Sequence, residues 1–151
     1  MINQLNYAEA KGLYSAILKL DADNIDALNS LAQCIRAIAN QQQNPNRQQV
    51  FSQALQLYQR ALSIDSEDFE TNFNLGVLYY EFKKDYEKAI YHLKLAINEE
   101  DNPTALFNLA VIFEEKGESQ DAMKMYKKVS QFLTKQANLN SVTVSALNLK
   151  F

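Results

Sequence analysis

A short apolar pattern that recurs at a fixed spacing constrains this chain more than any other feature of its sequence. Leu75-Gly76-x-x-Tyr79 recurs 34 residues later as Leu109-Ala110-x-x-Phe113. Apolar positions three and four residues apart lie on one face of an α-helix, and a period of about 34 residues is typical of stacked helical hairpins. The recurrence therefore predicts an all-α chain of antiparallel helical hairpins. It also favours binding over catalysis, because stacked repeats form extended binding surfaces.

The pattern divides the chain into a half-repeat and three full repeats. The half-repeat covers residues 6–24, and the full repeats cover residues 25–68, 69–102 and 103–134. About ten extra residues separate the two helices of the repeat 25–68, and we expect a polar surface insertion at 37–50. Residues 1–140 are thus expected to form the repeat domain, in a chain of 151 residues that suffices for one compact unit.

The half-repeat matches only the second helix of a hairpin, through Tyr7, Ala10, Tyr14 and Ile17. Either a short cap precedes this helix or the chain lacks an upstream helix. An unpaired second helix leaves part of its apolar face exposed, so we expect this end of the chain to be a contact surface.

The repeat pattern stops after Phe132, and residues 141–151 form a tail with a different pattern. The tail alternates like a strand, yet it also has an apolar cluster compatible with a helix. One interpretation is a capping helix over the last hairpin, since open repeat stacks need their final apolar face covered. The other is an extended tail that docks on a partner protein. β-Branched Val142, Thr143 and Val144 weaken the helical interpretation.

These positions resemble the tetratricopeptide repeat, a helical hairpin with W-x2-L-G-x2-Y in its first helix and A-x3-F-x2-A in its second. The resemblance covers residues 7 to about 132 and is strongest at Asp85-Tyr86-Glu87-Lys88-Ala89-Ile90 and from Gly117 to Tyr126. The opening aromatic residue of the motif is replaced by Leu28, Asn72 and Leu106. The resemblance implies a right-handed superhelix whose first helices line a concave groove. Proteins of this family typically hold peptides or partner helices there and serve as adaptors or scaffolds.

Residues displaced by one or two positions from the repeated core of each first helix are expected to face this groove. The candidate partner-binding residues are Asn29, Gln33, Phe73, Asn74, Val77, Tyr80, Phe107, Asn108 and Val111. Apolar side chains at these places either bind a partner or are covered by the chain's own tail. Similar asparagines in the family bind the backbone of extended peptides, which implies this role for Asn74 and Asn108, with a solvated amide as the alternative.

One subtype of the family is disfavoured by the groove residues. Tetratricopeptide co-chaperones that hold the acidic tails of heat-shock chaperones use lysines, an asparagine and an arginine. The corresponding places here hold Asn29, Gln33, Phe73, Val77, Thr104 and Asn108. Glu81, Glu114 and Glu115 would repel a carboxylate, so we expect an apolar or mildly basic helix or peptide as the partner.

Composition and charge exclude several other classes. The net charge of −3 and the pI near 5.2 argue against a nucleic-acid partner. No stretch approaches the roughly 18 apolar residues of a membrane span, and the first residues lack the features of a signal peptide. Cys34 is the only cysteine, so no intrachain disulfide forms. We expect a cytoplasmic protein, with a ciliary, axonemal or mitochondrial assembly as the alternative.

The sequence contains no pattern that indicates chemistry. His92 is the only histidine, lacks a nucleophile–base partner, and is expected on the surface or in the groove. Cys34 lies in an apolar pattern and is expected to be a buried structural thiol. No Gly-rich phosphate loop or Cys/His metal spacing is found, so we expect no metal, no cofactor and no enzymatic activity.

The sequence therefore indicates a non-enzymatic scaffold for protein–protein interaction, as a small subunit of a larger multi-protein complex. The alternative is a soluble adaptor that binds a short peptide motif reversibly. An RNA-binding helical-repeat protein ranks third, because the charge balance is acidic and the groove lacks basic residues.

Overall fold

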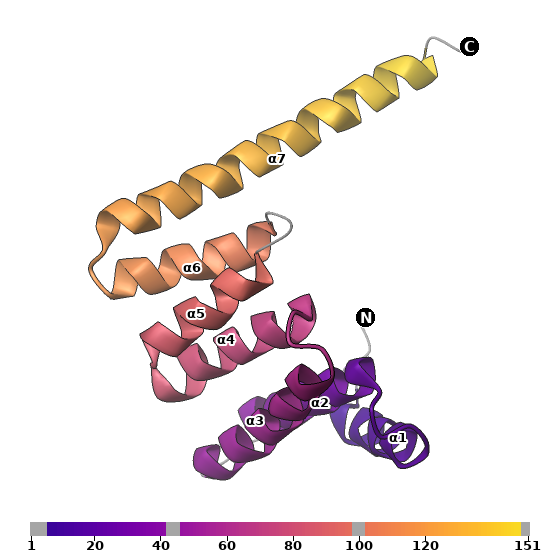
Figure 1. Ribbon diagram of the computed structural model, residues 1–151. Helices are drawn as coiled ribbons and strands as arrows, with labels where there is room; N and C mark the ends of the chain where they lie inside the picture. The colour runs from indigo at the N-terminus through magenta and orange to yellow at the C-terminus, as the bar shows by residue number, and fades with distance from the viewer. Residues whose placement is uncertain (1–5, 42–45, 98–101, 149–151) are drawn as a thin grey trace. The chain divides into compact units, whose positions relative to one another are not determined.

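The computed structural model describes residues 6–41, 46–97 and 102–148, and the described residues contain helices and no strand (Figure 1). The helices are α1 (Tyr7–Leu20), α2 (Ile25–Gln41), α3 (Arg47–Ile64), α4 (Phe69–Lys83), α5 (Tyr86–Ala96), α6 (Pro103–Glu115) and α7 (Ser119–Asn148). The prediction of an all-α chain of helical hairpins is confirmed. The chain divides into two compact units, residues 1–96 and 97–151. The length and the repeat pattern of the sequence suggested a single compact unit.

The first unit consists of two hairpins and one additional helix. α2 pairs with α3, α4 pairs with α5, and α1 packs against α2 (Figure 1). Capping side chains fix where α2, α4 and α5 begin. Asn24, Asp68 and Asp85 each accept a hydrogen bond from the backbone N–H three residues further on. These bonds satisfy donors that have no partner inside the helix.

The core of this unit lies where α2, α3 and α4 meet. Several of its side chains, among them Ala32, Tyr58 and Leu75, come from repeated positions of the sequence, and Phe51 and Tyr79 add an edge-to-face ring pair at 5.7 Å. The buried residues of this cluster are Ala32, Phe51, Ala54, Tyr58, Leu75 and Leu78. The positions that carry the repeat are thus the positions that hold adjacent helices together.

Gly76 shows why the repeat uses a small residue in its first helix. A Cβ atom at this position would lie 2.7 Å from Cγ of Leu93 and 3.1 Å from the carbonyl oxygen of Ala89. Both atoms belong to α5, so α4 and α5 approach more closely than a side chain at this position allows.

The second unit is the hairpin of α6 and α7. The Asn102 side chain accepts hydrogen bonds from the N–H groups of Thr104 and Ala105, and Pro103 occupies the first turn of α6, where its missing N–H costs nothing. Gly117 turns the chain with a φ of 82°, a conformation that favours glycine. α7 contains 30 residues against 13 in α6, so it continues well beyond its partner helix (Figure 1).

Most of the expected polar insertion at 37–50 is helical, which corrects the prediction. α2 continues to Gln41 and α3 begins at Arg47, while residues 42–45 lie outside the described part of the chain. Ala39 and Val50 are buried at 7% and 5% exposure. Burial of these two side chains stabilises the extension of both helices into a segment whose polar composition suggested a loop.

The tail is neither a separate capping helix nor an extended segment in its described part. α7 runs without a break through residues 141–148, and residues 149–151 lie outside the described part. No glycine or proline follows Gly117 in the sequence, so nothing ends the helix between the last repeat and the tail.

Candidate partner-binding surface

Asn29, expected in the groove, is fully buried between α2 and α4. Its Nδ2 donates to Oγ1 of Thr71 at 2.8 Å and to Oδ2 of Asp68 at 3.3 Å. With 0% exposure it cannot touch a partner in this conformation, so its assignment to the binding surface is corrected. Asn29 instead joins one repeat to the next through buried hydrogen bonds.

Two further side chains of α2 also bind α4. The exposed Gln33 donates from Nε2 to Oε1 of Glu70 at 2.9 Å. Arg36 forms an ion pair with Glu81 at 2.6 Å, with side-chain exposures of 12% and 39%. Polar side chains of α2 thus pair with the adjacent repeat along much of the helix.

Arg36 also faces the buried Tyr58 of α3. Burial raises the pKa of the Tyr58 hydroxyl, and the positive charge of Arg36 acts against this rise. Tyr58 is 0% exposed, and the guanidinium of Arg36 lies near its hydroxyl while it also reaches Glu81. This part of α2 is therefore structural.

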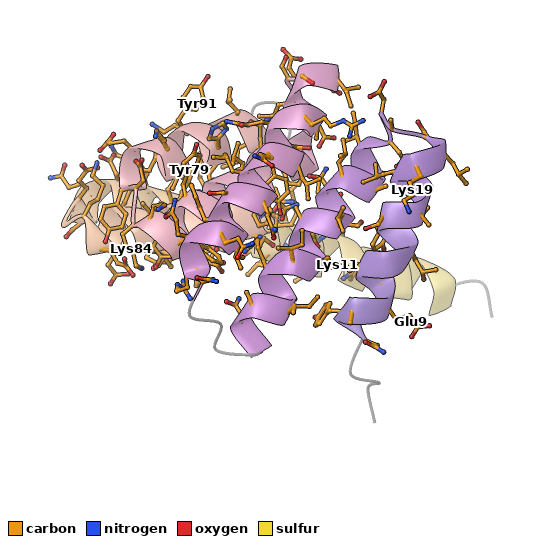
Figure 2. All side chains as sticks on the ribbon, turned by 90° about the horizontal axis from the view of Figure 1, so that it is seen from below. Glu9, Lys11, Lys19, Tyr79, Lys84 and Tyr91 are labelled. Atoms are coloured by element: carbon orange, nitrogen blue, oxygen red, sulfur yellow. The ribbon has the colours of Figure 1, made fainter. Side chains whose placement is uncertain are left out.

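α4 provides the open part of the expected groove in the first unit. Phe73, Val77 and Tyr80 are half-buried. The ring of Phe73 stacks on Phe69 with centroids 6.0 Å apart, and Phe69 itself is 40% exposed. The ammonium of Lys84, labelled in Figure 2, lies 4.0 Å from the centre of the Tyr80 ring. α4 thus presents aromatic and aliphatic surface at the places the sequence indicates.

Asn74 differs from this open surface because it is only 6% exposed. Its Nδ2 has no hydrogen-bond partner among the described residues. A partner's carbonyl group could satisfy this donor only if neighbouring side chains moved aside.

In the second unit, α6 carries the remaining candidates. Phe107 is 50% exposed and meets the ring of Tyr126 on α7 edge to face at 5.9 Å. Asn108 and Val111 are half-buried. The Tyr126 hydroxyl donates to Glu114 at 2.9 Å, and this bond raises the pKa of Tyr126. Phe107 is therefore the principal exposed aromatic side chain of α6.

His92 belongs to a polar cluster that the repeat pattern does not predict. The Nδ2 of Asn72 donates to the backbone carbonyls of Ser66 and Asp68, so its Oδ1 faces Nδ1 of His92 at 3.1 Å. Because Oδ1 only accepts, Nδ1 of His92 carries the proton. The signal in the sequence was Asn72 itself, a polar residue where the repeat motif has a large aromatic one.

Two tyrosines hold the His92 ring in place. Tyr79 stacks on it at 5.9 Å and Tyr91 meets it edge to face at 5.1 Å, and both are labelled in Figure 2. Burial lowers the pKa of His92, which keeps the ring neutral near pH 7. His92 is thus a half-buried structural residue rather than the surface or groove residue that was expected.

Cys34 is buried at 6% exposure, and burial raises the pKa of its thiol. A thiol that stays protonated is a poor nucleophile and a poor metal ligand. Within the described ranges, no group of three or more His, Cys, Asp or Glu side chains could hold a metal ion. None of the described helices is long and apolar enough to cross a membrane.

Repeated helical hairpins that present aromatic side chains on their first helices define a helical-repeat interaction scaffold. Comparison with family models supports the same class of protein. Residues 47–81 match a model described as a TPR repeat, and residues 104–131 match a model described as a tetratricopeptide repeat. The chain therefore contains tetratricopeptide repeats, and proteins built from such repeats are generally non-enzymatic scaffolds for protein–protein interaction.

Solved structures show the same fold. A thermophilic TPR protein of Thermus thermophilus, TTC0263, has a TM-score of 0.75 at 21% identity, over 91% of this chain and 71% of the other. A MamA RS-1 double mutant has a TM-score of 0.70 at 19% identity, over 89% and 70%. Another MamA structure has a TM-score of 0.66 at 21% identity, over 82% and 66%. The chain thus spans about two thirds of the length of these relatives. None of the curated protein sequences that were compared matches it.

Proposed function

We propose that this chain is a non-enzymatic subunit of a larger protein assembly and that it binds an apolar or mildly basic helix or peptide on α4. The observation that carries this proposal is the α4 aromatic surface, which consists of Phe69, Phe73, Val77 and Tyr80. Steps of four, four and three residues place these side chains on one face of the helix. Partly exposed aromatic side chains gathered on one helix face are typical of binding surfaces.

The charges beside this surface support a mildly basic partner. Glu70 is exposed, and its one described hydrogen bond comes from the neutral amide of Gln33, which leaves its negative charge uncompensated. Glu81 is neutralised by Arg36. A lysine or arginine of a partner bound on the α4 aromatic surface would therefore find its opposite charge at Glu70.

Phe107, Asn108 and Val111 form a second candidate contact surface, on α6 of the second unit. Phe107 is the most exposed of these side chains, so it is the contact we expect to matter most.

Affinity purification of tagged variants tests the proposal. We expect Phe73→Glu and Phe107→Glu to reduce the amount of co-purified partner, because a buried charge opposes an apolar contact. Tyr91→Glu is the matched control, since Tyr91 is an aromatic residue that is 60% exposed on a second helix. Unchanged partner recovery with both substitutions, in variants that keep wild-type circular dichroism, would exclude these surfaces as the binding site.

Solution behaviour separates the subunit from the reversible adaptor. We expect the isolated chain to associate or to require its partner for solubility. A stable monomer in light scattering that binds and releases a short peptide would favour the adaptor instead.

A further inference from the structure

Four cationic side chains gather around the end of α4, and each lies over a different aromatic ring. Arg47, Lys83, Lys84 and Lys88 lie 4.6, 4.7, 4.0 and 5.1 Å from the ring centres of Phe82, Phe51, Tyr80 and Tyr79, in that order. We call these four cations the basic cluster. They come from the start of α3, the end of α4 with the residue after it, and the first turn of α5. Figure 2 labels Lys84 and Tyr79 in this part of the first unit.

The aromatic rings hold the basic cluster in place. Phe51 is buried, and Tyr79, Tyr80 and Phe82 are half-buried, whereas all four cations are exposed. A cation over an aromatic ring is attracted to the ring face. Long side chains held in this way lose less conformational freedom when they bind a partner. The basic cluster is therefore a preorganised positive surface that has its aromatic rings beneath the charges.

The sequence places no carboxylate on the helix that begins beside this cluster. Residues 27–64, which include all of α3, contain no aspartate and no glutamate. Arg47 donates to the backbone carbonyl oxygen of Glu81 at 3.3 Å, and Lys83 donates to the side-chain amide oxygen of Gln48. Both hydrogen-bond acceptors are neutral. Among the described residues, Arg47 and Lys83 form no ion pair, so their charges stay available to a partner.

The carboxylates at the end of α4 and the start of α5 neutralise only part of this positive charge. Glu81 pairs with Arg36, which is outside the basic cluster, and Asp85 pairs with Lys88 at 3.4 Å. The third carboxylate, Glu87, is exposed on α5. Positive charge is therefore in excess at this end of the first unit, although the chain as a whole has a net charge of −3.

We propose that the basic cluster binds an acidic segment of a partner protein through aspartate or glutamate side chains spaced along that segment. The four cations lie over four separate rings and not around one point. They therefore match several single charges better than one multiply charged phosphate group. Arg47 adds a planar guanidinium, whose N–H groups suit the two oxygens of a carboxylate. Complementary charge at an exposed surface favours such an encounter.

Two other classes of anionic partner fit this surface less well. The net charge of −3 opposes a nucleic acid. The exposed Glu87 and the placement of the rings beneath the charges oppose an anionic membrane, because no ring is free to enter it. None of the four cations is among the residues expected in the groove, and only Tyr80 also belongs to the α4 aromatic surface. The proposal does not depend on the proposed function.

A fluorescein-labelled peptide of alternating glutamate and glycine serves as the probe. Its anisotropy is measured as the 151-residue chain is added at low ionic strength. We expect saturable binding that added salt weakens, because charges at an exposed surface are screened. Arg47→Glu with Lys83→Glu should weaken this binding by at least about tenfold, since two attractive charges become repulsive.

Lys11→Glu with Lys19→Glu is the matched control, because both lysines are exposed on α1 and the change in net charge is the same. This variant should bind the peptide as the wild type does, within about twofold. Equal weakening by the two double variants overturns the proposal, since net charge alone would then explain the binding. Equal binding of a peptide of alternating glutamine and glycine also overturns it.

Polyuridylate RNA and phosphatidylserine vesicles test the other anionic partners. If the wild type binds either of them and not the acidic peptide, and the Arg47/Lys83 variant loses this binding, the proposal is overturned in favour of a nucleic acid or a membrane. Circular dichroism should show all variants folded, because the substituted side chains are exposed. Should the glutamate variant unfold, Arg47→Gln with Lys83→Gln replaces it. This neutral variant should weaken peptide binding by at least about threefold, and unchanged binding would overturn the proposal.

Discussion

Gly76 and Gly12 both lie inside helices, yet their surroundings are opposite. A Cβ atom at Gly76 would meet Leu93 at 2.7 Å, whereas at Gly12 nothing lies within 4 Å. We expect Gly76→Ala to lower the free energy of unfolding by about 1–3 kcal/mol, because the packing between α4 and α5 has no room for a methyl group. Gly12→Ala should raise it by about 0.5–1 kcal/mol through helix propensity. Urea denaturation measures both, and a stabilising Gly76→Ala would contradict the close helix contact.

His92 makes the stability of the fold depend on pH. Burial lowers its pKa below the value of 6.5 that it has when unfolded, so the folded chain resists protonation. Its contribution to stability is complete above pH 6.5 and is lost as the pH falls below 6.5 towards the pKa of the folded state. Because His92 is the only histidine, the free energy of unfolding is compared at about pH 7.5 and about pH 5.5 in the wild type and in a variant without this side chain. His92→Gln should show a smaller loss over this range, and an equal loss would remove His92 as the cause.

The exposure of a side chain was predictable where a single repeat determines it. Phe73 and Phe107 occupy the same position of their repeats, and both are partly or largely exposed as expected. Asn29 occupies that position too, yet it is buried because Thr71 and Asp68 of the next repeat bind it. The pattern of one repeat does not show the side chains that the next repeat brings to it.

At the scale of elements, α2 and α4 are joined by hydrogen bonds, some of which are buried and others exposed to solvent. We expect Asn29→Ala to lower the free energy of unfolding by about 1–3 kcal/mol, because it leaves the polar groups of Asp68 and Thr71 with fewer partners in a buried place. Gln33→Ala removes an exposed bond to Glu70 and should change it by less than about 0.5 kcal/mol. Chemical denaturation of both variants checks this, and similar effects would show that burial does not set the strength of these contacts.

Helix types and pairings followed from the sequence, but some helix ends did not. The apolar spacing indicated every helix of the hairpins, while the polar segment after α2 suggested an early end. Burial of Ala39 and Val50 extends α2 and α3 into that segment. A few apolar side chains in a polar composition decide such ends, and their burial becomes visible only when both helices are in place.

For the whole molecule, the 34-residue period predicts the fold class and the order of the hairpins, and the structure confirms both. The division into two units after Ala96 has no counterpart in that period, because the repeat runs through this point without a change of spacing. Periodicity indicates which helices pair within a repeat. It does not show where packing along the chain divides.

Residues 133–140 of α7 contribute little burial to the stability of the chain. Residues 133–140 are all exposed, so this part of the helix buries no side chain within its unit. We expect deletion of residues 141–151 to leave the unfolding temperature and the helix content per residue nearly unchanged while it weakens partner binding. Circular dichroism melting checks the first point, and a decrease of several degrees would show that the tail acts as a cap.

The unequal lengths of α6 and α7 have a consequence for distance. At about 1.5 Å per residue, the 30 residues of α7 measure about 45 Å and the 13 residues of α6 about 20 Å. One end of α7 is anchored in the hairpin, so its other end stands roughly 25 Å away from it. A molecule attached at that end would therefore lie about this far from the hairpin of α6 and α7, so α7 reaches well beyond the hairpin that it helps to form.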